Sequence, residues 1–145
     1  MNFLTASMAL VLLFYHQITT WFPLFPWNDI DSLLRKDILL EAGTNGLLMG
    51  LGFACLIHAN TGFYHYYPLI YYPFLLSGEF FQWWLPFFSG DFSKSKVNFD
   101  YEKLYSRTVK FIAAKAGARV PDANHTLLHL LTLVTTILVY VARLR

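Results

Sequence analysis

Residues 75–86 have the sequence LLSGEFFQWWLP. They lie within a longer apolar run, 66–90, that is long enough to cross a membrane, yet they include the carboxylate of Glu79 and the amide of Gln82. A charged group at bilayer depth costs at least about 2.5 kcal/mol, so it usually faces a protein interior and has a partner there. The stretch therefore predicts a membrane helix with an inner face, and the rest of the chain must supply what surrounds Glu79.

The composition supports a membrane protein. The chain has 145 residues, of which 56% are hydrophobic and only 14% are charged, whereas charged residues make up about 25% of an ordinary soluble domain. The length suits one domain, residues 1–145. The single cysteine, Cys55, excludes an internal disulfide framework and a CxxC redox pair.

Hydropathy predicts four membrane spans. A span needs about 20 consecutive apolar residues, and the chain offers four such stretches, at about 3–25, 42–60, 66–90 and 125–142. The first has no basic segment before it and no small-residue cleavage site after it, so we expect a membrane helix and not a removable signal peptide. Short connections favour antiparallel neighbours. The predicted fold is all-α, an integral membrane four-helix bundle.

Two short interfacial helices are expected between the spans. In the first loop, Asp31 or Ser32 could cap a helix whose leucines lie on the membrane surface. In the third loop, 91–124, apolar side chains recur at helical spacing and predict an amphipathic surface helix. These are Tyr101, Leu104, Tyr105, Phe111 and Ile112. Asn124 is the expected cap of the last span.

Basic residues are distributed unevenly along the chain. Nine of the 11 lysines and arginines fall in the first and third loops, and the other two are Arg143 and Arg145. Because cytoplasmic loops are enriched in basic residues, both termini are predicted outside and the long loop, 91–124, in the cytoplasm. These basic residues have a simple use beside lipid phosphates, so no nucleic-acid partner is expected.

Small residues recur at steps of four in the second span. Ala42, Gly46, Gly50 and Ala54 form a smooth ridge on which another helix can pack closely. Packing within the chain is the simpler interpretation. The alternative is a seam for a second copy of the chain or for another membrane protein.

With this topology, each of the four spans contributes polar residues to the cytoplasmic half of the bundle, at a common depth. They are His16, Gln17, Asn45, Glu79, Gln82, His125 and His129. His58 and His65 fall at the opposite end. This shared depth predicts one buried polar site at the centre of the bundle.

A metal ion or haem is one interpretation of this site. His125 and His129 are four residues apart, so their imidazoles project from one helix face. With His16 and Glu79 they could supply three or four ligands to a metal ion, and two histidines from different helices could ligate haem. The HxxxH spacing alone arises often by chance.

Acid–base chemistry on a small lipid-like ligand is another interpretation. A buried carboxyl group beside a histidine can exchange a proton with a ligand. Glu79, His16 and His129 are the acid–base candidates. The expected ligand contacts are Asn45, Gln82, Trp83, Arg107 and Gln17.

Whether the protein is an enzyme is left open at this point. The alternative is a structural or accessory subunit in which the same polar groups bond to one another and fix the helix arrangement, while the small-residue ridge binds a partner. A proton-linked transporter that works as an oligomer is the third interpretation.

Overall fold

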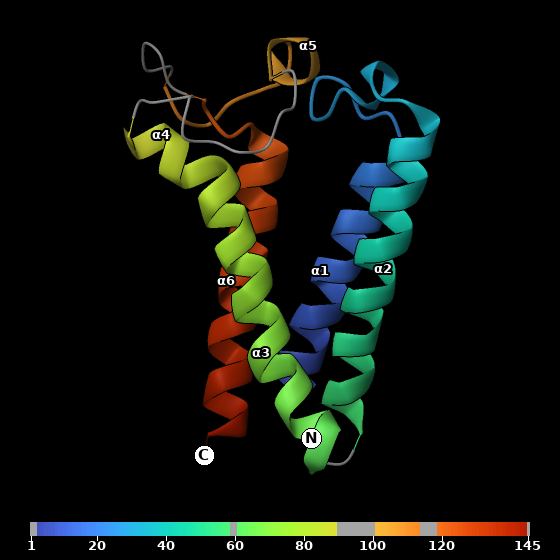
Figure 1. Ribbon diagram of the computed structural model, residues 1–145, viewed down its shortest axis with the longest axis vertical. Helices are drawn as coiled ribbons and strands as arrows, with labels where there is room; N and C mark the ends of the chain where they lie inside the picture. The colour runs from blue at the N-terminus through green and yellow to red at the C-terminus, as the bar shows by residue number, and fades with distance from the viewer. Residues whose placement is uncertain (1–2, 59–60, 90–100, 114–118, 145) are drawn as a thin grey trace.

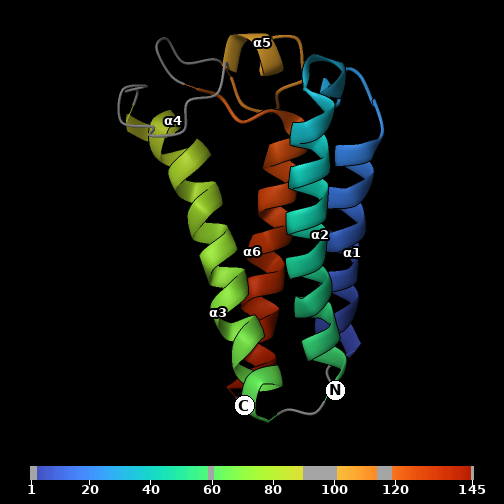
Figure 2. The same ribbon diagram turned by 45° about the vertical axis from the view of Figure 1, so that its right-hand side comes forward.

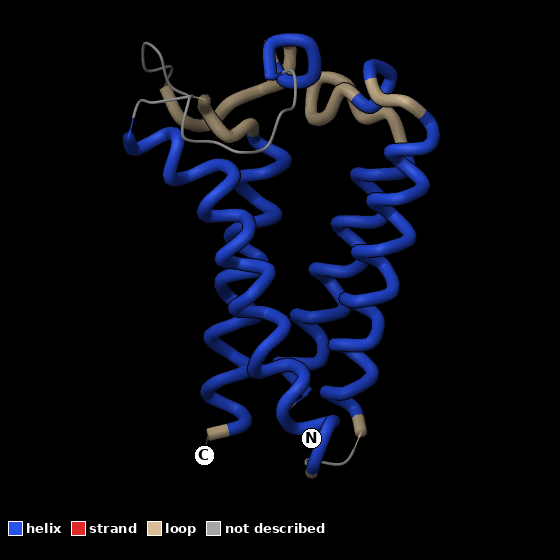
Figure 3. The backbone as a smooth tube through the Cα atoms, in the orientation of Figure 1, coloured by secondary structure: helices blue, strands red, loops and turns tan. Residues whose placement is uncertain are grey.

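The computed structural model describes residues 3–58, 61–89, 101–113 and 119–144. All regular structure in these ranges is helical and they contain no strand, which confirms the all-α prediction (Figure 3). In chain order the elements are α1 (Phe3–Trp21), η1 (Ile30–Ser32), α2 (Arg35–Ile57), α3 (Gly62–Glu79), η2 (Phe80–Trp84), α4 (Leu85–Ser89), α5 (Tyr101–Tyr105) and α6 (Ala123–Arg143).

Four long helices pack side by side (Figures 1 and 2). Helix α1 contacts α2 and α6, and α3 contacts the same two helices from the other side. Helix α1 begins and α6 ends at one end of the molecule, which we call the terminal end. Helix α5 and the segment that joins α1 to α2 lie at the opposite end, which we call the loop end.

Three of these helices, α1, α2 and α6, are long and apolar enough to span a membrane. Helix α3 has 18 residues, but its tyrosines, two prolines and Glu79 lower its mean hydropathy. It continues without a break through η2 and α4, so the helical segment extends from Gly62 to Ser89. This covers most of the predicted third span.

Helix α2 begins earlier than predicted. It starts at Arg35, so residues 35–41, which were expected on the membrane surface, form its first turns. No proline separates Arg35 from Ala42, and nothing else there stops the helix from propagating. The predicted cap was wrong, because Leu34 occupies the N-cap position and makes no side-chain cap bond.

The helix in the third loop is shorter than predicted. Helix α5 ends at Tyr105, so the expectation that it would continue to Phe111 and Ile112 was wrong. The backbone of Val109 is engaged elsewhere: its N–H donates to the carbonyl of Pro26, and its own carbonyl accepts from the N–H of Ala123. These bonds hold the segment against the first loop and exclude a helical hydrogen-bond pattern.

The start of α6 also differs by two residues. Its N-cap is Asp122, whose carboxylate accepts a hydrogen bond from the backbone N–H of His125 at 2.8 Å. Asn124, the predicted cap, lies inside the first turn. Its side-chain oxygen instead accepts a hydrogen bond from the hydroxyl of Tyr15 at 2.8 Å.

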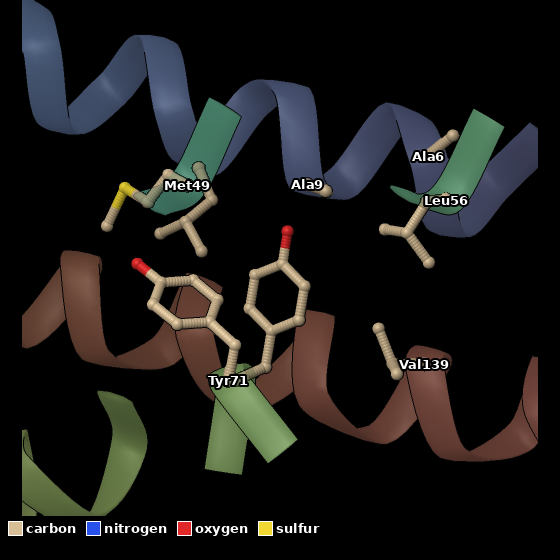
Figure 4. Close-up of a cluster of buried hydrophobic side chains, with 8 residues drawn as sticks. Ala6, Ala9, Met49, Leu56, Tyr71 and Val139 are labelled. Carbon is tan, nitrogen blue, oxygen red and sulfur yellow. The ribbon is translucent and has the colours of Figure 1, made fainter. Parts of the chain in front are cut away.

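The apolar core lies between the four long helices, towards the terminal end. Figure 4 shows side chains from all four helices converging there. The buried members are Ala6, Ala9, Leu12, Met49, Leu56, Tyr71, Tyr72 and Val139.

Outside this core, the usual distribution of polarity is reversed. The buried face of α6 has polar side chains: His129, Thr132 and Thr135 are at most 4% exposed. Large apolar side chains point outward, and Leu47 and Ile70 are 73% and 68% exposed. Extended apolar surface around a polar interior is typical of a protein that lies in a membrane.

Candidate functional site

A cavity of about 380 Å³ opens between the helices towards the loop end. We call it the chamber. Its lining is formed by His16, Glu41, Asn45, Met49, Phe74, Leu75, Gly78, Glu79, Gln82, Trp83, Tyr105, His125, Leu128 and His129. A smaller pocket of about 50 Å³ shares His16, Glu41, Tyr105, His125 and Leu128 with it and extends to residues of the first loop.

The chamber brings together most of the polar residues that the sequence placed at one depth. Helix α1 contributes His16, α2 contributes Asn45, the α3–η2 segment contributes Glu79 and Gln82, and α6 contributes two histidines. They meet because these helices are neighbours and because each residue lies in the loop-end half of its helix.

Glu79 is the most constrained of these groups. Its side chain is buried, with a relative exposure of 8%. One carboxylate oxygen, Oε1, accepts a hydrogen bond from the hydroxyl of Thr132 at 2.8 Å. The other, Oε2, is buried and has no hydrogen-bond partner. An unsatisfied buried oxygen is rare in native proteins and calls for a specific explanation.

Glu79 is also the last residue of α3 before the π-helix η2. A π turn holds an extra residue, so it changes which side chains face the neighbouring helix, and such turns are frequent at functional sites. Here both tryptophans of η2 contact histidines of α6: the Trp83 ring lies beside both His125 and His129, whereas Trp84 contacts His129. The Trp83 ring lies 4.2 Å from the ring of His125, and the Trp84 indole N–H donates to Nδ1 of His129 at 3.0 Å.

The bond from Trp84 fixes the tautomer of His129. An indole N–H can only donate, so Nδ1 of His129 must accept and has no proton. The proton of this neutral imidazole is therefore on Nε2. Since His129 lines the chamber, this leaves one N–H donor on the ring whose position is set by Trp84.

On the opposite wall, α1 and α2 are joined by side-chain amides. The Asn45 amide nitrogen lies 3.1 Å from Nε2 of His16. The Gln17 amide donates to the carbonyl of Ala42 at 3.1 Å and accepts from the indole of Trp21. Gln17 was predicted as a ligand contact, but it does not line the chamber. Its bond to Ala42 holds α1 against α2, and its bond to Trp21 lies within α1.

At the loop end, Asp122 is paired with His125. Nδ1 of His125 lies 2.7 Å from Oδ1 of Asp122. Burial alone would raise the pKa of Asp122, but the hydrogen bonds and charge of His125, with a further bond from Thr108, hold this pKa below its ordinary value. Asp122 is therefore ionised at neutral pH, and it balances any charge on His125.

Tyr105 extends from α5 over the chamber. Its ring lies 5.0 Å from that of Trp83 and 5.1 Å from that of His125. Burial, together with the negative charges of Glu41 and Asp122, raises the pKa of the Tyr105 hydroxyl above its ordinary value. The hydroxyl therefore stays protonated and adds no charge to the chamber.

Arg107 was predicted to contact the ligand, but it lies outside the lining of the chamber. Its guanidinium donates twice to Oδ2 of Asp29, at 2.6 and 3.0 Å, and sits 5.6 Å from the centre of the Phe25 ring. These contacts tie the third loop to the first. The role of Arg107 as a ligand contact gains no support from this position.

Two chamber residues with ionisable side chains, Glu41 and Tyr105, were missed by the sequence analysis, as were several apolar residues of the lining. Glu41 was assigned to a surface helix because the start of α2 was placed too late. With α2 beginning at Arg35, Glu41, Asn45 and Met49 are successive members of one helix face. The spacing of four was therefore present in the sequence, and only the helix boundary concealed it.

The metal interpretation has little in the geometry to support it. Among the described residues, no group of three or more histidine, cysteine, aspartate or glutamate side chains is placed to hold a metal ion. The rings of His125 and His129 are 6.0 Å apart, and their Nδ1 atoms are directed to Asp122 and Trp84. Haem ligation by these histidines gains no support either.

Comparison with known proteins found no matching family model, no matching curated protein and no matching solved structure. The function is therefore argued from the chamber itself.

Proposed function

We propose that this chain is a four-span membrane protein that binds a small amphiphilic molecule in the chamber, with Glu79 as the polar anchor of the ligand. The observation that carries the proposal is the buried Oε2 atom of Glu79, which has no partner, in a residue that lines a cavity of about 380 Å³. Pockets for small molecules have volumes of roughly 300–1,000 Å³ and combine apolar walls with a few placed polar groups.

The walls of the chamber fit an amphiphile. Phe74, Leu75 and Leu128 supply apolar surface, while Asn45 and Gln82 supply amide groups. In this proposal the α3–η2–α4 segment also spans the membrane, in addition to α1, α2 and α6. The ligand reaches the chamber from the cytoplasmic half of the bilayer.

A purely structural role accounts less well for the same contacts. If the polar groups served only to hold the helices together, they would be expected to satisfy one another without leaving a cavity. Glu79 instead makes one hydrogen bond, to Thr132, and its second oxygen is left over.

Proton transfer on the bound molecule is a second candidate function. The tautomer set by Trp84 gives His129 an N–H at Nε2, while Oε2 of Glu79 is an acceptor. Both residues line the chamber. Acid–base chemistry requires at least a donor and an acceptor, and here they belong to two residues that line one cavity, although Oε2 itself is buried.

The ligand-binding proposal can be tested by filling the chamber. A Cβ atom added at Gly78, which lines the chamber, meets no atom within 4 Å, and the same holds at Gly43, which does not line it. Both positions therefore have room for a Cβ atom. We expect Gly78→Leu to narrow the chamber, and Gly43→Leu is the matched control. Each variant and the wild type would be purified in a neutral detergent, and small molecules that copurify would be measured by native mass spectrometry.

We expect the wild type and Gly43→Leu to retain the same molecule in stoichiometric amount and Gly78→Leu to lose it. Equal retention by Gly78→Leu would show that the molecule is bound elsewhere on the protein. If the wild type retained no molecule, the proposal would have to be abandoned.

A further inference from the structure

We infer that the ligand of the chamber is an organic cation, such as a protonated or quaternary amine with an apolar body. This inference rests on the proposed function and adds the charge of the ligand to it.

The charge of the chamber lining favours a cationic ligand. Two carboxylates, Glu41 and Glu79, line the chamber, and the described residues that line it include no lysine or arginine. Nε2 of His16 lies 3.8 Å from Oε1 of Glu41, whose side chain is half-exposed. Glu79 is buried, and its Oε2 has no hydrogen-bond partner. A buried carboxylate without a cationic partner is costly in an apolar environment, and a cationic ligand would supply that partner for Glu79.

The histidines do not supply the missing positive charge. His129 is neutral in this geometry, because its Nδ1 accepts the hydrogen bond from Trp84. Any charge on His125 is matched by Asp122, which lies 2.7 Å away. Neither histidine therefore offsets a negative charge on Glu41 or Glu79.

The aromatic residues of the lining also favour a cationic ligand. Trp83 and Tyr105, from η2 and α5, and Phe74, an α3 residue that is 76% exposed, all line the chamber. The face of an aromatic ring attracts a cation, and aromatic side chains around a quaternary ammonium group are a recurrent recognition mode. An anionic head group would instead meet two carboxylates.

A set of three probes with the same phenylbutyl body would test this inference. They are 4-phenylbutyltrimethylammonium, its uncharged isostere with carbon in place of nitrogen, and the anion 4-phenylbutanesulfonate. Binding of each probe to the full chain in a neutral detergent would be measured by isothermal titration calorimetry.

We expect the wild type to bind the cation about tenfold more tightly than the isostere and not to bind the anion. Glu79→Gln should lower the affinity for the cation by about tenfold and leave that for the isostere unchanged. Glu41→Gln changes a half-exposed side chain and should weaken the binding of the cation only. This variant remains informative if Glu79→Gln does not fold. Gly43→Leu should bind like the wild type.

The outcomes separate this inference from the proposed function. One outcome is that the cation and the isostere bind equally, that neither glutamate variant changes their affinities, and that Gly78→Leu abolishes binding of both probes. The chamber would then bind ligands without selecting cations. The inference would be overturned and the proposed function retained. If no probe bound the wild type and no molecule copurified with it, both would be overturned.

Discussion

Glu79 and Thr132 form one hydrogen bond between α3 and α6, in a part of the protein where both side chains are buried. The Thr132 hydroxyl also lies 3.0 Å from the carbonyl of Leu128 on its own helix. At the scale of single residues, this bond determines whether the carboxylate has any partner within the protein. Its loss would leave both oxygens of Glu79 without one.

A matched pair of threonine variants tests this bond. Thr132 and Thr135 are both fully buried on α6, but the hydroxyl of Thr135 has no hydrogen-bond partner. We expect Thr132→Val to lower the free energy of unfolding by about 1–3 kcal/mol, because it leaves a buried polar group unsatisfied. Thr135→Val should be neutral or stabilising, because it removes an unsatisfied hydroxyl.

Unfolding of both variants by sodium dodecyl sulfate in mixed micelles would provide the comparison. Equal destabilisation by the two substitutions would mean that the bond to Glu79 contributes nothing and that the cost comes from the exchange of threonine for valine.

At the scale of elements, the close packing of α2 depends on which of its glycines contact a neighbouring helix. The sequence predicted that α2 packs closely on another helix along a ridge of small residues, at steps of four from Ala42. A Cβ at Gly46 would lie 2.8 Å from the Gln17 amide, so this part of the ridge does pack closely on α1. A Cβ at Gly50 would meet no atom within 4 Å. The ridge therefore faces α1 over only part of its length, and Gly50 is open to a partner or to lipid.

Helix α2 also packs closely on α3 at Gly52, which the ridge does not include. A Cβ there would lie 2.8 Å from the hydroxyl oxygen of Tyr72 and 3.2 Å from its ring, and Tyr72 is fully buried. We expect Gly52→Ala to destabilise the protein by about 1–3 kcal/mol, because a buried ring has little room to move.

Gly50→Ala is the control, since it makes the same change two residues away on the same helix. It should be neutral or stabilise the helix by up to about 1 kcal/mol, which is the difference in helix propensity between glycine and alanine. Thermal unfolding followed by circular dichroism would show the difference. A stable Gly52→Ala variant would mean that α3 can shift away from α2.

At the scale of the whole molecule, the four long helices form a closed ring, with polar side chains inside towards the loop end and apolar side chains outside. We propose that the loop end faces the cytoplasm, because nine of the 11 basic residues fall either in the first turn of α2 or in the sequence between α4 and α6. The terminal end, with the short turn between α2 and α3, would then face outward.

Cysteine labelling of intact cells can test this orientation. The native Cys55 is fully buried and serves as a silent background. Thr61, beside α3 at the terminal end, and Ser106, beside α5 at the loop end, are both exposed. With a membrane-impermeant maleimide, we expect Thr61→Cys to be labelled in intact cells and Ser106→Cys only after permeabilisation. The reverse pattern would invert the orientation.

Much of the fold and part of the chamber were predictable because they depend on local properties. Hydropathy over a window predicted the spans, and α1, α2 and α6 are long and apolar enough to be such spans. The depth of a polar residue follows from its position along a span, which is why His16, Asn45, Glu79 and His129 were expected together. Side chains whose position depends on a loop, such as Arg107 and Tyr105, could not be placed in this way.

The sequence by itself determined that the chain is helical and apolar and that its polar residues gather in one half of its spans. Only the tertiary structure decided that Trp83 and Trp84 of the π turn contact His125 and His129, that Glu41 lines the chamber, and that Oε2 of Glu79 has no partner. The physical reason is that hydropathy and helical periodicity are properties of neighbouring residues. A cavity, and an oxygen left unsatisfied beside it, exist only between helices that are distant in the chain.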